Sequence, residues 1–140
     1  MPELVSTRLL PCSPERAFAA LSDVEQLVRW WGPDGFTSTS ERFDFRPGGA
    51  WTMVMHGPDG TDYPNLYRFV AIEPAVRAVL EHPGDPHWFE LTIAFEEAPN
   101  GTRLTWRQRF EDEAHFAEIK DFVATANEQV LARLAAVVAA

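Results

Sequence analysis

The C-terminal part of the sequence is the feature that most restricts the fold. After Asp112, apolar residues recur at helical spacing over roughly 26 residues, or about 39 Å of helix. The predicted apolar stripe consists of Phe116, Ile119, Val123, Val130, Leu134 and Val137. A helix of this length with one apolar face must bury that face, so the rest of the chain has to supply a large apolar surface.

The residues from Phe36 to Phe110 are predicted to supply that surface as an antiparallel sheet. Their apolar residues alternate with polar ones, and turn sequences at 47–49, 57–60, 83–86 and 100–101 interrupt the pattern. In the last predicted strand, one face carries Leu104, Trp106, Gln108 and Phe110. The other face is charged or polar, as expected of a sheet with one dry and one wet side. Asn100-Gly101 is predicted to form a two-residue hairpin loop, since both residues tolerate positive φ.

The N-terminal residues predict one strand followed by two short helices. A strand over 3–10 ends at Pro11, and Ser13 is the expected N-cap of a helix with Pro14 at its first position. Ser22 and Glu25 have the spacing of a capping box for a second helix, which Gly32-Pro33 ends. In the sequence, the two predicted helices therefore come between the first strand and the remaining strands.

Together these elements predict an α+β fold in a single domain spanning 1–140. A curved antiparallel sheet of six or seven strands wraps round the long C-terminal helix, with two short helices after strand one. A twisted sheet of this size curls, and side chains do not fill every gap beneath a helix lying across it. The fold therefore predicts an internal cavity between the sheet and the helix.

Composition argues against several classes of function. The formal net charge of −9 opposes binding to nucleic acid or to anionic membranes. Cys12 is the single cysteine, so no intrachain disulfide or thiolate metal cluster is expected. No uncharged apolar run of about 18 residues is present, and the N-terminus has no signal-peptide pattern. We therefore expect a cytoplasmic protein without nucleic-acid or membrane partners.

Several short motifs occur in an order that is typical of one superfamily. They are Ser13-Pro-Glu-Arg-Ala-Phe18, Trp30-Trp31-Gly-Pro33, Arg46-Pro-Gly-Gly-Ala-Trp51 with Met53 and Met55, Gly60, Ile72-Glu-Pro74 and Phe95-Glu-Glu-Ala-Pro-Asn-Gly-Thr102. In these motifs the chain resembles the START-like, polyketide-cyclase-like (SRPBCC) helix-grip superfamily. Within it, the chain resembles the bacterial proteins similar to the activator of heat-shock-protein ATPase. The resemblance implies the helix-grip fold and an internal cavity.

Two features depart from the pattern that this resemblance implies. Many relatives carry a Gly-Trp pair in the middle of the last helix, where this chain has Ala126-Asn127. Tyr67 lies near a position where relatives often have glycine. The resemblance therefore implies a cavity whose shape differs from that of many relatives.

The candidate ligand-binding residues are large or polar side chains predicted on inward faces. They are Trp30, Trp31, Phe36, Trp51, Met53, Met55, Tyr67, Phe69, Trp106, Gln108, Val123 and Asn127. Aromatic and Met side chains give a pocket adaptable walls, but at strand spacing they are core residues by default, so roughly half are expected to line the cavity. Gln108 is the one polar residue on its dry face and needs a partner, which is a ligand, Asn127 or a water.

Residues with possible catalytic or metal chemistry give weaker patterns. His82, Asp85 and His87 surround a turn, but their spacing matches no standard zinc site and a solvated loop is expected. His56 alternates with Met55 and is expected to face water. No Ser–His–Asp or His–carboxylate set can be assigned, and no metal or cofactor is predicted.

Three functions remain open from the sequence. The leading hypothesis is binding of a small hydrophobic molecule in the internal cavity. One alternative is a cyclase- or hydrolase-type enzyme that uses the same cavity. The other is a protein-interaction module, acting as a chaperone partner or as a homodimer.

Overall fold

The computed structural model describes residues 1–84 and 86–139. Within these residues the chain forms seven strands in one antiparallel sheet and three helices. In chain order they are β1 (Glu3–Leu10), α1 (Pro14–Ser22), α2 (Val24–Trp30), β2 (Thr37–Phe43), β3 (Ala50–His56), β4 (Asp62–Glu73), β5 (Arg77–His82), β6 (Phe89–Ala98), β7 (Gly101–Phe110) and α3 (Glu113–Ala139). The predicted α+β helix-grip class is confirmed.

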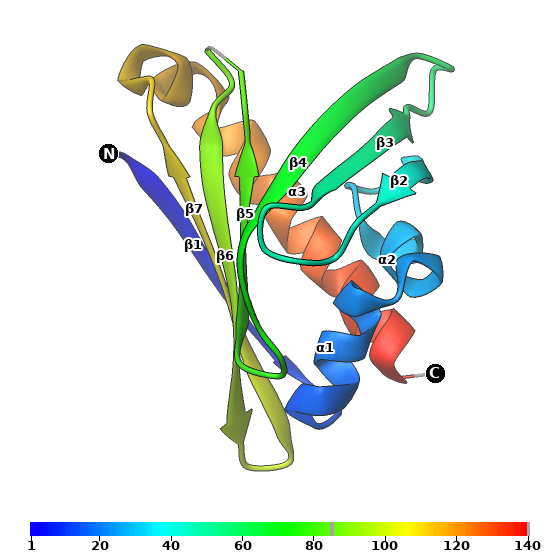
Figure 1. Cartoon of the computed structure of the whole chain (residues 1–140). Coiled ribbons are helices and arrows are strands. Elements are labelled where there is room, and N and C mark those ends of the chain that lie inside the picture. The colour runs from blue at the N-terminus through cyan, green and yellow to red at the C-terminus, as the bar shows by residue number, and fades with distance from the viewer. Residues whose placement is uncertain (85, 140) are drawn as a thin grey trace.

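Strands β2 to β7 form a meander, and the last of them, β7, pairs with β1. The strand order of the sheet is β1-β7-β6-β5-β4-β3-β2, so β1 and β2 form the two edges. Figure 1 shows α3 crossing one face of the sheet, with α1 and α2 beside its C-terminal half. At the other end, the β3–β4 and β5–β6 turns diverge (Figure 1). The end where these turns diverge, at which the N-terminal half of α3 lies, is the open end of the sheet (Figure 1).

The faces of β7 follow the predicted alternation. Leu104, Trp106, Gln108 and Phe110 are buried, and the arginines between them are exposed. The hairpin before β7 differs from the prediction, because β6 ends at Ala98 and the loop consists of Pro99 and Asn100. Asn100 has the expected positive φ of 66°, but Gly101 already belongs to β7.

The cap between the first two helices also differs from the prediction. Ser13 accepts a hydrogen bond from the Arg16 amide at 3.1 Å, as expected of an N-cap. Ser22, however, is the last residue of α1, and Asp23 caps α2 by accepting from the Glu25 amide at 3.1 Å. Asp23 follows α1 directly, so this one residue ends the first helix and begins the second.

The buried face of α3 is shifted from the predicted stripe. It consists of Asn127, Val130, Leu131, Leu134 and Val138. Phe116, Ile119, Val123 and Val137 are only partly buried, and Phe122 is 69% exposed. Full burial begins at Asn127 because the N-terminal half of α3 lies at the open end of the sheet.

Arg133 joins α3 to the end of α2. Its Nη1 donates to the carbonyl oxygens of Gly32 at 2.6 Å and Pro33 at 3.3 Å, and its Nη2 donates to that of Arg29 at 2.9 Å. Carbonyl groups at a helix C-terminus lack intrahelical donors and attract positive charge. Arg133 therefore holds the Trp30-Trp31-Gly-Pro33 segment against α3.

Replacing Arg133 with Met is expected to lower the free energy of unfolding by about 1–2 kcal/mol, since the carbonyl groups lose a charged donor. Arg133→Lys is expected to recover only part of this loss, because an ammonium group cannot reproduce the planar fork. Urea unfolding measures both changes. Arg103→Met on the exposed face of β7 is the control, and equal losses at Arg103 and Arg133 would contradict the assignment.

Candidate functional site

A chamber of ≈ 110 Å³ lies between the sheet and α3. It is lined by Trp31, Gly32 and Pro33 after α2, Met55 on β3, Tyr67 on β4, Phe89 and Leu91 on β6, Trp106 and Gln108 on β7, and Ala126, Asn127 and Val130 on α3. The chamber begins where full burial of α3 ends. The chamber therefore lies at the boundary between the buried C-terminal half of α3 and the open end of the sheet.

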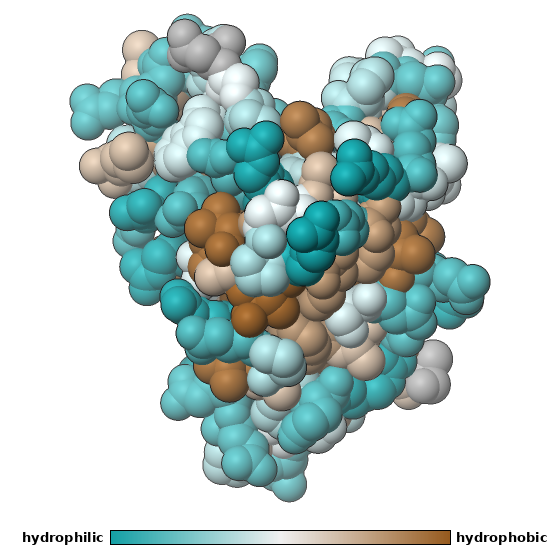
Figure 2. Space-filling model, in the orientation of Figure 1, coloured by the Kyte–Doolittle hydropathy of each residue, from teal (hydrophilic) through white to brown (hydrophobic). Residues whose placement is uncertain are grey.

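A larger groove of ≈ 650 Å³ adjoins the chamber. The two share Pro33, Met55, Phe89 and Ala126, so these four residues form the junction between them. The outer residues of the groove are Phe36, Asp62, Tyr63, Pro64, Asn65, His82, His87 and Phe122. A notch separates the two diverging turns in the space-filling view, and hydrophobic residues gather near its base (Figure 2).

Trp31 is at the centre of the aromatic wall. Its ring centroid lies 5.4 Å from that of Tyr67 and 5.6 Å from that of Trp106. Trp30 is also buried, but its indole N–H donates to the Ala20 carbonyl at 2.9 Å, and its ring packs on the core side of Trp31. Of the adjacent indoles, only that of Trp31 lines the chamber.

Two amide side chains meet in the chamber wall. Asn127 Nδ2 donates to Gln108 Oε1 at 3.0 Å, and both residues are buried. Of the three partners considered for Gln108, the structure shows Asn127. This pairing links β7 to α3 across 19 residues of sequence.

Two further polar groups belong to residues of the chamber wall. Burial raises the pKa of Tyr67 to about 12, so its hydroxyl is protonated at neutral pH. The indole Nε1 of Trp106 is buried and has no hydrogen-bond partner among the described residues. None of the described residues that line the chamber carries a charged side chain.

The structure separates the predicted site residues into three groups. Trp31, Met55, Tyr67, Trp106, Gln108 and Asn127 line the chamber. Phe36 lines the groove, together with Met55. Trp30, Trp51, Met53, Phe69 and Val123 line neither space. Contact of any of these residues with a ligand stays a prediction.

Of the residues that line neither space, Val123 is only partly buried on α3. The other four are buried core residues. Trp51 is fully buried, donates to Ser40 Oγ at 3.1 Å and stacks on Tyr67. Met53 and Phe69 are fully buried in the core. Trp51 therefore supports the Trp31 and Tyr67 side chains of the chamber wall.

Sequence reasoning missed several lining residues. In the chamber these are Gly32, Pro33, Phe89, Leu91, Ala126 and Val130. Two signals were available, since Gly32-Pro33 follows the Trp pair directly and Ala126 directly precedes the candidate residue Asn127. The small Ala126 side chain leaves space at the junction, which larger apolar residues would fill.

His82 differs from the solvated-loop expectation. Its ring stacks on that of Phe89 with centroids 4.8 Å apart, and its Nε2 lies 3.1 Å from Asn65 Oδ1. Desolvation by burial lowers the pKa of His82. Asp85 lies outside the described residues, and residues 1–84 and 86–139 hold no group of three potential metal-binding side chains.

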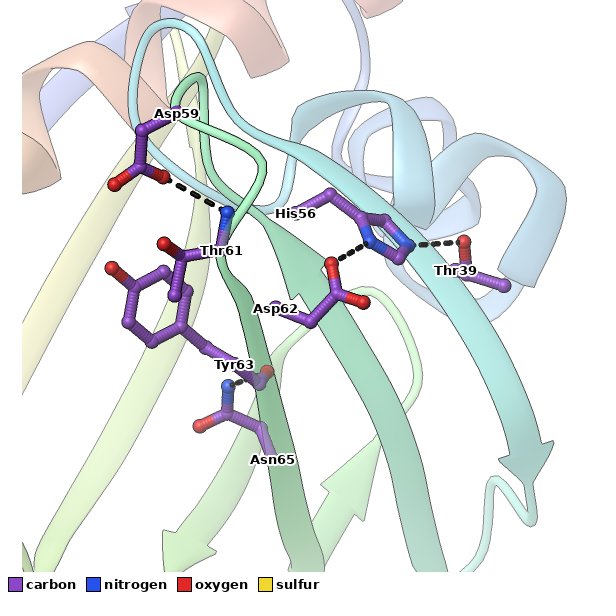
Figure 3. A network of polar contacts seen from close by, with 7 residues as sticks. All are labelled: Thr39, His56, Asp59, Thr61, Asp62, Tyr63 and Asn65. Carbon is purple, nitrogen blue, oxygen red and sulfur yellow. Dashed lines mark hydrogen bonds and ion pairs between the residues drawn. The ribbon is translucent and has the colours of Figure 1, made fainter.

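A hydroxyl–imidazole–carboxylate set that the sequence did not reveal lies on β2, β3 and β4. His56 Nε2 is 2.8 Å from Thr39 Oγ1, and His56 Nδ1 is 2.7 Å from Asp62 Oδ1 (Figure 3). The order of contacts is that of a nucleophile, a base and an orienting carboxylate. Thr39 and His56 nevertheless line neither the chamber nor the groove, and Thr39 is exposed. The set therefore ties three strands together on the face away from Met55.

Comparison with known proteins gives one family and many similar folds. A model of the family "Activator of Hsp90 ATPase homolog 1-like protein" matches residues 11–139. A crystal structure from Nitrosomonas europaea is similar with a TM-score of 0.88 and 21% identity, over 97% of this chain and 93% of that one. A solution structure from Arthrobacter aurescens has a TM-score of 0.90 and 25% identity, over 98% and 86%. The AHSA1 protein from Silicibacter pomeroyi has a TM-score of 0.78 and 23% identity, over 99% and 98%.

No curated protein matches the chain significantly. By length and composition alone, α3 would be long and apolar enough to cross a membrane. In the structure this helix packs across the sheet and buries Val130, Leu131 and Leu134 in the core. Its apolar character is therefore explained by the core of a fold found in soluble proteins.

Proposed function

The chain belongs to the family of Activator of Hsp90 ATPase homolog 1-like proteins, and on that premise we propose that it binds a small hydrophobic molecule in the chamber and groove. The observation that carries the proposal is the chamber walled by Trp31, Tyr67 and Trp106 that continues into an apolar groove. Sites for small molecules are typically concave and mostly apolar, with a few polar groups that orient the ligand.

The size of the two spaces supports a ligand that occupies both. A dry cavity of about 150 Å³ holds one benzene molecule, so the chamber of ≈ 110 Å³ accommodates only one end of a larger compound. The groove of ≈ 650 Å³ offers room for the remainder. We therefore expect a ligand with one end in the chamber and an apolar body across Pro33, Met55 and Phe89.

The residue types in the chamber favour binding over catalysis. General acid–base chemistry at neutral pH needs a group whose pKa lies near 7. Among the described residues that line the chamber, only Tyr67 is ionisable, and burial raises its pKa to about 12. The amides of Gln108 and Asn127 orient a ligand by hydrogen bonds, but they are poor acids and bases.

Titration with a panel of fatty acids, flavonoids and polycyclic compounds tests the proposal. We expect at least one compound to change Trp fluorescence and raise the melting temperature, because Trp31 and Trp106 line the chamber. Ala126→Phe is expected to weaken binding at least about tenfold by filling the junction. Thr125→Phe, at an exposed position of the same helix, is the control.

Two results would contradict the proposal. One is a panel in which no compound changes either fluorescence or melting temperature. The other is unchanged binding by the Ala126→Phe variant, which would place the ligand elsewhere.

Location and assembly complete the proposal. We infer a cytoplasmic protein without nucleic-acid or membrane partners, supported by the net charge of −9. A homodimer is the assembly to test. Native mass spectrometry of freshly purified protein would report both the subunit number and any co-purified small molecule.

A further inference from the structure

The two edges of the sheet differ in how they are protected against pairing with another strand. An edge strand has unpaired N–H and C=O groups, and proteins often block it with a bulge or with exposed charges. β2 has a bulge between Ser40 and Arg42, and both Glu41 and Arg42 are exposed. β1 pairs with β7 in one unbroken register from Glu3 to Leu10. β1 is therefore the less protected edge.

The backbone groups of β1 that point away from the sheet belong to its odd-numbered residues. The Phe110 amide donates to the Pro2 carbonyl oxygen at 2.9 Å, and the register then continues without a shift. Because bonded and non-bonded pairs alternate in an antiparallel ladder, the even-numbered residues bond to β7. The N–H and C=O groups of Val5, Thr7 and Leu9 therefore point outward. Among the described residues, no backbone group outside the ladder bonds to them.

The side chains of the same three residues form a small exposed surface with apolar ends. Val5 is 48% exposed and Leu9 is 61% exposed, and Thr7 lies exposed between them. Glu3 shares this face of β1 and forms an ion pair with Arg107 at 2.9 Å. The free backbone groups and the exposed apolar side chains thus lie on one segment of β1.

One register joins two copies of this segment with matching residues. Two identical antiparallel strands are related by a twofold axis, and the outward backbone groups bond only when odd-numbered residues lie opposite each other. With the axis at Thr7, Val5 lies opposite Leu9 of the second copy. An axis one residue earlier places Leu9 opposite Glu3, and one residue later places two Arg8 residues opposite each other. Apolar cross-strand pairs stabilise a sheet and like charges destabilise it, so the axis at Thr7 is favoured.

We propose that two copies of this chain form a twofold homodimer in which their β1 strands pair antiparallel around Thr7. The inference gives the homodimer named above an interface. It does not depend on a ligand, because Val5, Thr7 and Leu9 line neither the chamber nor the groove. A contact through one pair of strands is smaller than the standard interface of about 1,600 Å². We therefore expect a dimer that dissociates at micromolar concentrations.

Sedimentation equilibrium of the full chain between about 1 µM and 1 mM measures the association. Val5→Lys is expected to weaken it at least about tenfold, since the twofold axis makes each substitution act at two places in the interface. Val70→Lys is the matched control. Val70 is also 48% exposed, but it lies on β4 inside the sheet.

Thr7→Pro tests the backbone pairing. Proline removes an N–H group that points outward and takes no part in the ladder with β7, a position that tolerates proline in edge strands. We expect this variant to be monomeric with an unchanged circular dichroism spectrum. In ¹⁵N-labelled wild-type protein, the amide hydrogens of Val5 and Leu9 are expected to exchange at least about tenfold more slowly in concentrated than in dilute samples. In Thr7→Pro their exchange is expected not to depend on concentration.

Val5→Lys combined with Leu9→Glu tests the register. Among the registers compared, only an axis at Thr7 places the introduced lysine of one copy opposite the introduced glutamate of the other. The double variant is therefore expected to associate more tightly than either single variant. A double variant that associates no better than the single variants would overturn the register.

Three results would overturn the dimer itself. They are a wild-type protein that stays monomeric up to about 1 mM, equal weakening by Val5→Lys and Val70→Lys, and a dimer that folded Thr7→Pro still forms. The proposed ligand binding is tested separately. Variants that no longer dimerise are expected to bind the same compounds as the wild type, so loss of the dimer and loss of the ligand site are distinguishable.

Discussion

Replacing Gly101 with Ala is expected to lower the free energy of unfolding by about 3 kcal/mol or more. A Cβ atom at this position would overlap the Leu10 carbonyl oxygen. The obstacle is backbone at the end of β1, which the Thr102 hydroxyl also holds by donating to the Cys12 carbonyl at 2.7 Å. Neither side can move without disturbing the pairing of β1 with β7, so the close approach requires glycine.

Gly48→Ala is the matched control for this variant. A Cβ atom at Gly48 meets nothing within 4 Å, but the φ angle of 82° disfavours alanine. The expected cost there is about 1 kcal/mol, from backbone conformation alone. Urea unfolding of both variants compares the two effects, and a smaller loss for Gly101→Ala than for Gly48→Ala would show that β1 yields easily.

Replacing Asn127 with Leu is expected to cost about 2 kcal/mol of unfolding free energy, because the buried Gln108 amide loses its partner. Gln108→Leu is expected to destabilise for the reciprocal reason. The double variant is expected to be more stable than the sum of the two losses predicts, by about 1 kcal/mol, since neither amide is then left unpaired.

Chemical denaturation of the four proteins in this cycle measures the coupling. Thr125→Leu, on the exposed part of α3, is expected to change stability by less than about 0.5 kcal/mol. Strictly additive losses for Gln108→Leu and Asn127→Leu would mean that the two amides do not stabilise the contact between β7 and α3.

Local patterns in the sequence were sufficient for the fold. Alternation along β7 placed Gln108 among buried residues, and Ser13-Pro14 marked the start of α1. These features depend on the spacing of neighbouring residues, which is the information that a single sequence carries. The apolar face of the long C-terminal helix had to be buried, and the sheet was the large apolar surface available for it.

The residues that line the site could be identified only from the distances between secondary-structure elements. Trp30 and Trp31 are adjacent residues of the same type, yet only Trp31 lines the chamber. The indole N–H group of Trp30 instead donates to the Ala20 carbonyl. Phe122 and Val130 both suit an apolar helix face, but Phe122 lies where the sheet has opened. Periodicity does not reveal where a curved sheet separates from a helix.

The sequence by itself determined the order of the elements, the dry face of the sheet and the need of Gln108 for a partner. Tertiary structure alone decided that this partner is Asn127, that the chamber begins beside Ala126, and that Thr39, His56 and Asp62 meet across three strands. The physical reason is that side-chain direction follows from local backbone geometry. Contacts between distant residues follow instead from strand register and from the position of α3 on the sheet.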